Sequence, residues 1–383
     1  MATNRLLIVG DLFPFNSNLD LFCEGDVKAL FGDDVCDMFA KADYRICNLE
    51  GVLTDGPGQC KKTGPVIKAP TLAVNAYKAL GIDCCMLANN HITDAGTQGV
   101  KETLEVLDNA CIRHIGVGLN KTSIFHYTVI NIEDNKICIY NVGERMYNMA
   151  TDTEAGIWLY DEYLVCKELE SMKSHCDYLI VIYHGGIEKF QYPSPETRKR
   201  FHRMADSGAD VVLSQHTHCI GCEEYYKGAY LLYGQGDFLF NNFNPSITDS
   251  GLIIEISFNN RTFEVNKHKT KTTDFRVRYN KMQDFSDFEK RSAELKDEAF
   301  VESQFQRFCY KELRLYLSAY KSLSRPQRVL RKFFPSYFKK WLYHHAFKEK
   351  DLLFALHTLR SEQNRETAIV GLEKLLNDFN LSW

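Results

Sequence analysis

The sequence lacks any apolar run as long as the ~18 residues that a membrane-spanning helix needs. Its first residues lead into a short apolar segment that ends in Gly-Asp, which is too short for the core of a secretory signal peptide. Internal repeats and low-complexity segments are missing too. We therefore expect a globular protein of the cytoplasm.

Strong charge of one sign is also missing. The 383 residues include 46 Lys and Arg and 50 Asp and Glu, a net charge of −4, which gives no indication of a nucleic-acid partner. The 13 cysteines are odd in number and irregularly spaced, so we expect free thiols in a reducing compartment. Cys219 and Cys222 form a Cys-x-x-Cys without the second pair that a structural zinc site would need.

What the sequence does contain is an alternation of short apolar runs with helical patterns. Strands are expected at 5–10, 44–47, 82–88, 112–116, 126–132, 136–142, 177–183, 210–214, 229–233, 252–258 and 261–268, and helices at 71–80, 97–110, 161–174 and 195–207. Such alternation predicts an α/β fold with largely parallel strands. The strands from 225 to 268 follow one another without helices, so we expect them to be antiparallel or edge strands of a mixed sheet system.

The composition changes near Asp284. Beyond it, helical patterns are expected at 286–322, 326–348, 350–359 and 363–379. The sequence therefore predicts two domains, an α/β domain at 1–285 and a helical domain at 286–383. The segment 325–350 interleaves basic and aromatic residues, which is typical of contact with an anionic membrane surface, a polymer or a partner. The alternative is that its aromatic residues pack inward while its charges face water.

Five polar clusters stand where apolar strands end. They are Gly10-Asp11, Asn48-Leu49-Glu50, Asn89-Asn90-His91, His184-Gly185-Gly186 and His216-Thr217-His218. In an open α/β sheet, ligands bind beyond the carboxyl ends of the strands, so distant segments can meet at one point. Each residue taken singly also fits a turn, a helix cap or an ordinary histidine, whereas five such strand ends together indicate a common site.

The chemistry of these clusters indicates a metal centre. The candidate ligands are Asp11, Glu50, Asn90, His184, His216 and His218. A mixed nitrogen and oxygen set suits Mn, Fe, Zn, Ni or Co. Six ligands exceed the needs of one catalytic zinc, and fit two cations that share a carboxylate and lower the pKa of a bridging water.

Local features support this interpretation. On an extended strand end, His216 and His218 would point the same way, because side chains alternate with a period of two. The glycines after His184 let the backbone turn sharply. His91 stands beside a candidate ligand and is expected to protonate a leaving group as the general acid.

At these residues the chain resembles the CapA family of capsule and poly-γ-glutamate biosynthesis proteins, within the calcineurin-like metallophosphoesterase superfamily. The resemblance covers roughly residues 5 to 260. It is carried by Asn48-Leu49-Glu50-Gly51, Ala88-Asn89-Asn90-His91-Ile92-Thr93-Asp94-Ala95-Gly96, His184-Gly185-Gly186-Ile187-Glu188, Gly208-Ala209-Asp210-Val211-Val212 running to His218, Glu224-Tyr225-Tyr226-Lys227-Gly228 and Gly234-Gln235-Gly236-Asp237-Phe238. It implies a four-layer sandwich, in which two mixed β-sheets are flanked by helices.

The resemblance also implies how the ligands are shared. The first metal would take Asp11, Glu50 and His218, and the second would take Glu50, Asn90, His184 and His216. The first is one ligand short, because Phe13 stands where the superfamily has the histidine of Asp-x-His. Two further departures are Glu50 in place of Asp and Gln215 where Gly is frequent. The centre is thus expected to hold one or two divalent ions.

Four further residues match family positions. Lys68 and Asn89 are expected to contact an anionic substrate, and Asp94 and Glu188 to orient imidazoles. Asp94 could instead cap the helix that begins near Thr97. Two hypotheses follow. The first is a metal-dependent hydrolase of a phosphate ester or related anionic substrate, small or polymeric, in capsule, polysaccharide or poly-γ-glutamate metabolism. The alternative is a non-catalytic assembly factor that associates with a polyanion or a membrane.

Overall fold

The computed structural model describes residues 4–60, 64–146, 148–240, 248–259, 262–319 and 332–334. The helices expected beyond 326 and the basic aromatic segment 325–350 lie outside these residues, apart from 332–334. The chain divides into two units after Phe305, and the first unit contains both sheets and every candidate site residue.

Two β-sheets form the centre of the first unit. The larger has eight strands in the order β18-β17-β16-β1-β2-β5-β6, with β15 also paired to β1. Its strands are β1 (Arg5–Leu12), β2 (Tyr44–Leu49), β5 (Cys84–Met86), β6 (Arg113–Ile115), β15 (Asp237–Leu239), β16 (Ser250–Asn259), β17 (Thr262–Thr273) and β18 (Arg276–Tyr279). The second sheet has six strands in the order β13-β14-β12-β11-β9-β8. They are β8 (Tyr127–Ile132), β9 (Asn135–Gly143), β11 (Tyr178–His184), β12 (Val211–Gln215), β13 (Glu223–Tyr226) and β14 (Ala229–Leu232).

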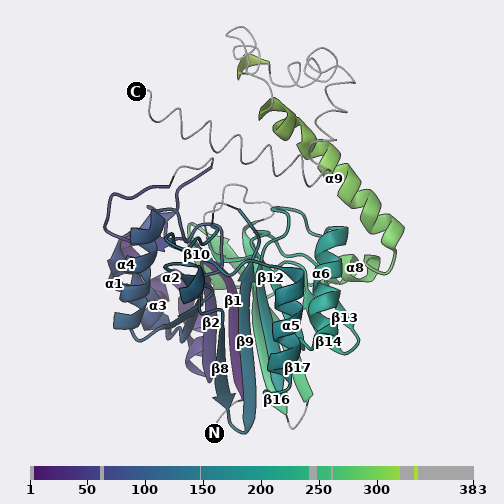
Figure 1. The fold of residues 1–383 in the computed structure, drawn as a ribbon, viewed down its shortest axis with the longest axis horizontal. Coiled ribbons are helices and arrows are strands. Elements are labelled where there is room, and N and C mark those ends of the chain that lie inside the picture. The colour runs from purple at the N-terminus through teal and green to yellow at the C-terminus, as the bar shows by residue number, and fades with distance from the viewer. Residues whose placement is uncertain are drawn as a thin grey trace. The chain divides into compact units, whose positions relative to one another are not determined.

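Helices cover the outer face of each sheet (Figure 1). Against the larger sheet pack α1 (Leu19–Glu24), α2 (Val27–Ala40), α3 (Val74–Leu80) and α4 (Gly96–Asn109). Against the smaller one pack α5 (Glu162–Lys173) and α6 (Pro195–Asp206). Later in the chain, α8 (Ser286–Glu294) leads into α9 (Glu298–Ala319). Short pairs β3 (Val52–Leu53) with β4 (Lys68–Ala69) and β7 (Val117–Gly118) with β10 (Gly156–Ile157), and the 3-10 turns η1 (Thr71–Ala73) and η2 (Lys121–Ser123), complete the unit.

The alternation of side chains along β1 explains the layering. Leu6 and Ile8 enter the core between the two sheets, whereas Leu7 and Val9 enter the core under α1 to α4. Because both faces of the strand are buried, its sequence is apolar without interruption. The four-layer α/β sandwich that the family resemblance implied is therefore confirmed.

Three expectations about the elements differ from the structure. The pattern did not predict α1 and α2, where Gly32 at φ +76° interrupts the helical path of α2. The strands after residue 225 are not all antiparallel, because β14 runs parallel to β12 and β15 runs parallel to β1. The long helix expected at 286–322 is two helices, α8 and α9.

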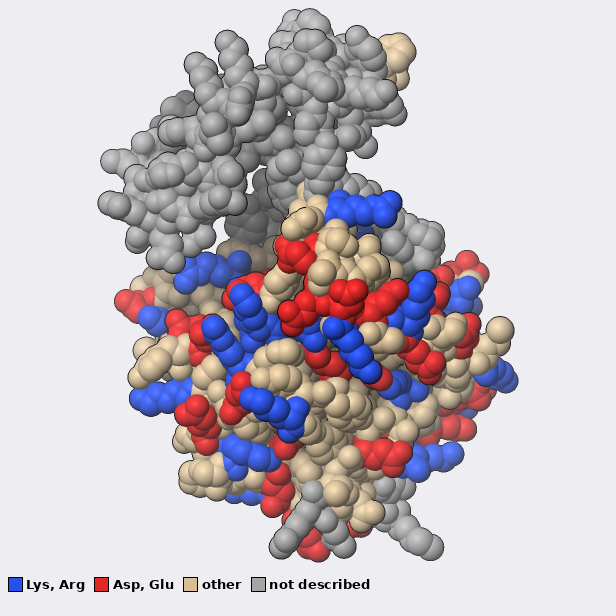
Figure 2. All heavy atoms as spheres, turned by 90° about the vertical axis from the view of Figure 1, so that its right-hand side faces the viewer, with Lys and Arg blue, Asp and Glu red and all other residues tan. Residues whose placement is uncertain are grey.

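The separate helical domain at 286–383 stays a prediction, because most of it lies outside the described residues. Its first part packs on the sheets: Phe288 belongs to the core between them, and Leu295 and Val301 to the core beside α5 and α6. Among the helices of the described residues, none has both the length and the apolar character needed to cross a membrane. On the described surface in Figure 2, Lys and Arg are interspersed with Asp and Glu.

Candidate metal centre

The two sheets deliver their polar strand ends to one place. Asp11, near the end of β1, is in register with Asn48 of β2 and with Asp237, the first residue of β15. In the second sheet, His184 ends β11 beside Gln215, which ends β12. The carboxyl ends of parallel strands thus gather acidic, amide and imidazole groups from distant parts of the chain, as expected for an α/β site.

Two buried glutamines tie the sheets together at this point. The Gln215 side-chain amide donates to Val9 O (3.2 Å) and Gln235 Oε1 (3.1 Å), and the Gln235 amide donates to Ile8 O (2.7 Å) and Leu252 O (3.0 Å). Gln215, at a position where the superfamily often has Gly, therefore links the second sheet to β1. The bonds hold the polar strand ends of both sheets at a fixed separation.

Gly10 allows β1 to approach the segment before β15. A Cβ atom added at Gly10 would lie 2.2 Å from Gly236 O, a backbone atom that cannot move without shifting β15. We expect Gly10→Ala to destabilise the protein by about 3 kcal/mol or more, at the upper end of overpacking costs. Urea unfolding measures the loss.

The control is Gly228→Ala, where a Cβ would meet no atom within 4 Å but φ is +93°. It carries only the backbone cost, about 1–2 kcal/mol. Equal unfolding midpoints for Gly10→Ala and the wild type would contradict the close approach.

A first group of donors surrounds His218. Its Nδ1 lies 2.8 Å from Asp237 Oδ1 and 3.4 Å from Asp11 Oδ2, and its Nε2 lies 3.8 Å from Glu50 Oε1. Asp11, His218 and Asp237 each offer an atom within 4.8 Å of the others, which is a spacing that one cation can bridge. Three predicted ligands of the first metal, Asp11, Glu50 and His218, therefore lie together.

A second group of donors also meets Glu50. His184 Nε2 is 2.8 Å from Asn90 Oδ1 and 3.6 Å from Glu50 Oε1. The ring of His216 is 4.8 Å from that of His184, centroid to centroid, and Glu50, His216 and His218 also meet within 4.8 Å. Glu50 is common to both groups, as the position of a shared carboxylate requires. The structure thus brings all six predicted ligands together, and their roles stay predictions.

Unsatisfied buried atoms support the fit of these residues to cations. Among the described residues, both oxygens of Glu50, Nδ1 of His216 and Oδ2 of Asp237 are buried without a hydrogen-bond partner. Leaving a buried polar atom without a partner costs free energy, and a buried charge costs more. A donor set of carboxylate oxygens and imidazole nitrogens is the set that divalent first-row metals favour, so the residues fit one or two such ions.

The electrostatics of the cluster follow from burial and crowding. Burial, followed by the nearby Asp11 carboxylate, raises the pKa of Glu50 well above its ordinary value. Burial also lowers the pKa of His184, and the neighbouring imidazoles add to the effect, so this ring is neutral. Burial opposes a charge on His218 as well, but the carboxylates of Asp237 and Glu50 outweigh it and raise the pKa of His218. A neutral imidazole is the form that binds a metal.

His91 is oriented by Asp94. Its Nδ1 lies 2.8 Å from Asp94 Oδ2, and its backbone N–H donates to Asn89 Oδ1 (3.1 Å). Asp94 also accepts from the Ile67 N–H at 2.7 Å. The helix α4 begins at Gly96 without a side-chain cap, so the alternative that Asp94 caps this helix is wrong. The geometry is that of a carboxylate that fixes the direction of an imidazole.

Asn89 does not face outward. It is fully buried, and its amide donates to Leu49 O (2.8 Å) and Asn48 Oδ1 (3.2 Å). Asn48 in turn donates to Asp11 Oδ1 at 2.7 Å. Asn89 therefore braces the loop under the site, and this geometry gives no support to the prediction that it contacts substrate.

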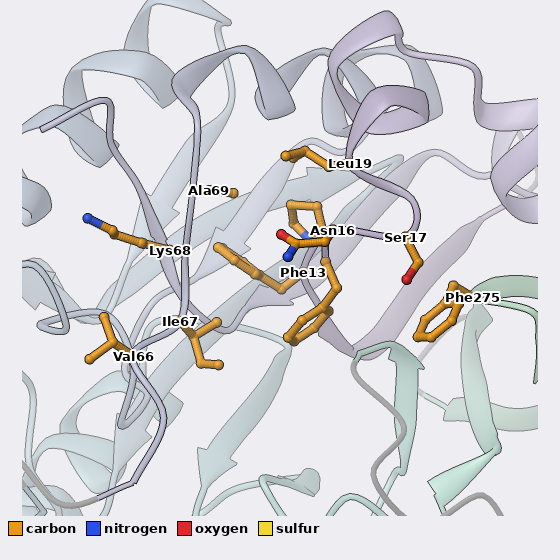
Figure 3. Close-up of a pocket in the computed structure, with 11 residues that line it drawn as sticks. Phe13, Asn16, Ser17, Leu19, Val66, Ile67, Lys68, Ala69 and Phe275 are labelled. Carbon is orange, nitrogen blue, oxygen red and sulfur yellow. The ribbon is translucent and has the colours of Figure 1, made fainter. Parts of the chain in front are cut away.

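Lys68 and Glu188 belong to neither of the two groups of donors. Lys68 lines a pocket of about 290 Å³ together with Phe13, Phe15 and Phe275 (Figure 3), and its ammonium donates to Gly56 O at 3.3 Å. Glu188 is exposed, and its negative charge acts against the lowering of the His216 pKa by burial. The substrate role of Lys68 and the orienting role of Glu188 stay predictions.

The paired histidines do not sit on an extended strand. β12 ends at Gln215, and His216 and His218 have φ of +83° and +52°, in the left-handed region. The argument from strand alternation is therefore wrong, although both rings do reach Glu50. Backbone strain of this kind costs of order 1–3 kcal/mol and is common at functional sites.

Asp237 is the acidic residue of the cluster that the ligand prediction missed. It follows Gly-Gln-Gly rather than an apolar run, so the search for strand ends passed over it. Its signal was the Gly-Gln-Gly-Asp-Phe string, which matched the family without a chemical role.

Comparison with known proteins places the chain. The model of the family described as bacterial capsule synthesis protein PGA_cap matches residues 5–242. The capsule biosynthesis protein CapA of Bacillus anthracis is 26% identical over 193 residues, which are 49% of this chain and 47% of the relative. The PGA biosynthesis protein CapA of Bacillus subtilis is 24% identical over 221 residues, 56% of this chain and 58% of the relative. The matched part of the chain thus spans about half the length of these relatives.

Among solved structures, a novel phosphatase from Mycoplasma pneumoniae has 15% sequence identity, covers 74% of this chain and 98% of its own, and gives a TM-score of 0.43. This likeness is too slight to add to the assignment. The family model, which matches well over half of the chain and includes every candidate ligand, is sufficient. The chain belongs to the PGA_cap family of bacterial capsule synthesis proteins.

Proposed function

We propose that the protein is a metal-dependent hydrolase that cleaves a phosphate ester or a related anionic bond. The observation that carries the proposal is Glu50, a fully buried carboxylate whose two oxygens have no partner and which lies between His184 and His218. A buried charge in this setting needs a compensating cation. The donor set suits Mn, Fe, Zn, Ni or Co.

The residues assigned to the ions follow the two groups around Glu50. Asp11 and His218 would hold one ion, Asn90, His184 and His216 would hold the other, and Glu50 would be shared. Such ions, when bound, polarise the scissile group, lower the pKa of water and neutralise the charge that develops on the leaving and attacking oxygens. The strand ends hold the ligands in place, because the glutamine bonds and the register of β1 leave them little freedom.

His91 is proposed as the proton donor to the leaving group. With Nδ1 at 2.8 Å from Asp94, the proton passed to substrate is assigned to Nε2. Asp94 holds the ring in a fixed direction. Phe240 packs against both His91 and His218, at centroid distances of 6.5 and 5.0 Å, and limits the access of water to this side of the site.

The substrate class comes from the family. Two relatives carry the names capsule biosynthesis protein and PGA biosynthesis protein, so we propose an anionic substrate, small or polymeric, in the making of such a polymer. The positively charged side chain of Lys68 would contact this anionic substrate. The segment 325–350 would contact a partner or a membrane. The expected cytoplasmic location belongs to the same proposal.

The test begins with the metal. We expect the protein purified in the presence of Mn²⁺ to contain metal by elemental analysis and to hydrolyse at least one member of a panel of phosphomonoesters, phosphodiesters and γ-glutamyl amides. Chelation should remove the activity, and added Mn²⁺ should restore it, because the ligands fold into place before the ion binds.

Two other outcomes of this test would count against the proposed hydrolase. Hydrolysis that survives complete chelation would contradict a metal-dependent mechanism. Protein that binds metal but cleaves nothing in the panel would favour the alternative of a non-catalytic assembly factor. The matched control is His175→Ala, which removes an exposed imidazole outside the site and should leave hydrolysis unchanged.

A further inference from the structure

Asp237 is placed in the metal centre by the backbone around it. It begins β15, which runs parallel to β1, and it stands directly opposite Asp11. Gly236 before it has φ +73°, and a Cβ there would lie 2.6 Å from Ser250 O. The backbone at Gly236 thus follows a tight path that requires glycine, and this path brings the Asp237 carboxylate to the end of β1.

The two oxygens of Asp237 have different surroundings. Oδ1 lies 2.8 Å from Nδ1 of His218, whereas Oδ2 is buried and has no partner. Asp237 is only 1% exposed, so this oxygen is shielded from bulk solvent. A carboxylate that served only to orient His218 would need one oxygen, and the second would carry the cost of burial without return.

The charges around it are also unbalanced. Asp11, Glu50 and Asp237 are three buried carboxyl groups, and each has an oxygen within 3.8 Å of a ring nitrogen of His218. Asp11 Oδ1 accepts from the Asn48 amide, whereas neither oxygen of Glu50 meets a hydrogen-bond donor within the part of the chain that the structure describes. A divalent cation among these three carboxyl groups would compensate their negative charge and engage the oxygens that have no other partner.

We propose that Asp237 is a direct ligand of the cation bound by Asp11, Glu50 and His218, and that it replaces the imidazole missing at Phe13. The inference rests on the proposed metal centre and extends it with a residue of this chain. The Phe13 ring is occupied elsewhere: it packs over Gly51, where an added Cβ would lie 2.4 Å from it. With Asp237, the first ion has four protein ligands, and its site is as complete as the second.

Titration with Mn²⁺ tests the assignment without any substrate. The variant is Asp237→Asn, because an amide oxygen still accepts the His218 N–H while the negative ligand is lost. We expect the wild type to bind two Mn²⁺ per chain by calorimetry and elemental analysis. In the variant, one of the two is expected to be lost or weakened by more than ~100-fold, beyond the effect of removing a residue that only orients a ligand.

The matched control is Glu255→Gln. Glu255 is also a buried carboxylate of the larger sheet beside an imidazole, with Oε2 at 3.3 Å from His268 Nε2. This change should leave both Mn²⁺ affinities intact. Retention of both ions by Asp237→Asn within ~100-fold of the wild type would overturn the proposal.

Diffraction from Mn²⁺-loaded crystals gives a second, independent result. Anomalous density with an Asp237 oxygen within roughly 2.0–2.6 Å would support direct ligation. An Asp237 beyond that distance and bonded only to His218 would overturn it. A wild type that binds no Mn²⁺ would overturn the proposed function as well, whereas two ions in both proteins would overturn this inference alone.

Discussion

Replacement of Glu50 by Gln is expected to abolish hydrolysis and to remove both metal ions. Glu50 Oε1 lies 3.6 Å from His184 Nε2 and 3.8 Å from His218 Nε2, so this carboxylate faces both groups of donors. An amide of the same shape keeps the packing but supplies no charge to either ion. Metal affinity should fall by more than the ~100-fold that loss of an orienting residue costs. Elemental analysis after dialysis and a hydrolysis assay measure the two effects.

The same variant should be more stable than the wild type when no metal is present. Burial raises the pKa of Glu50 in the folded state, so the unfolded chain loses this proton at lower pH than the folded one. Ionisation of Glu50 therefore costs stability as the pH rises above the unfolded value of about 4.3. Gln avoids that cost, and we expect a gain of about 1–3 kcal/mol at pH 8 and less at pH 5. Urea unfolding in the presence of a chelator measures it.

Glu255→Gln separates this effect from a general property of buried acids. The contact with His268 Nε2, 3.3 Å away, lowers the pKa of Glu255, so its charge is stabilised by folding, and Gln at this position should destabilise the protein. A Glu50→Gln protein that keeps both metals, or that is less stable than the wild type under chelation at pH 8, would contradict the role of Glu50 as the shared ligand.

The convergence of the site could be predicted because it depends on strand ends. Asp11, His184 and His216 each follow a run of buried aliphatic residues, and such runs identify strands in a sequence. Parallel pairing then brings their ends to one edge. The family motifs supplied the order of the ligands, which apolar patterns alone do not contain.

What could not be predicted depends on backbone paths between the strands. The left-handed φ of His216 and His218 is set by the turn after β12 and leaves no mark in the apolar pattern. Asp237 enters the site because β15 lies beside β1, a long-range pairing of a strand with only three residues. Short strands without a preceding apolar run carry too little periodic signal to be recognised.

The roles of the Asn89 and Asp94 side chains could not be predicted from the sequence either. Both belong to one motif, and only the fold decides that Asn89 turns inward to Leu49 O while Asp94 meets the ring of His91. Asn89 also depends on Leu49 O and Asp94 on the Ile67 N–H, which are backbone partners far away in the sequence.

Replacement of His91 by Ala is expected to slow hydrolysis in a way that depends on the leaving group. If Nε2 of His91 protonates the departing oxygen, an alkyl ester needs that proton and should lose about 10²–10⁴-fold in kcat. A nitrophenyl ester leaves as a stable anion and should lose far less. Metal content should not change, because His91 is held by Asp94 and Asn89 rather than assigned to an ion. A pair of substrates that differ only in the leaving group measures the effect.

A second variant, Asp94→Asn, changes the partner of His91 and identifies the origin of the loss in hydrolysis rate. Its amide still lies beside Nδ1 of His91 but no longer stabilises the charged ring, so the alkyl ester should be affected in the same direction and less strongly than by His91→Ala. Equal losses for the alkyl and nitrophenyl esters in His91→Ala would mean that the histidine acts on binding or on the metal centre, and would remove it from the proton-transfer step.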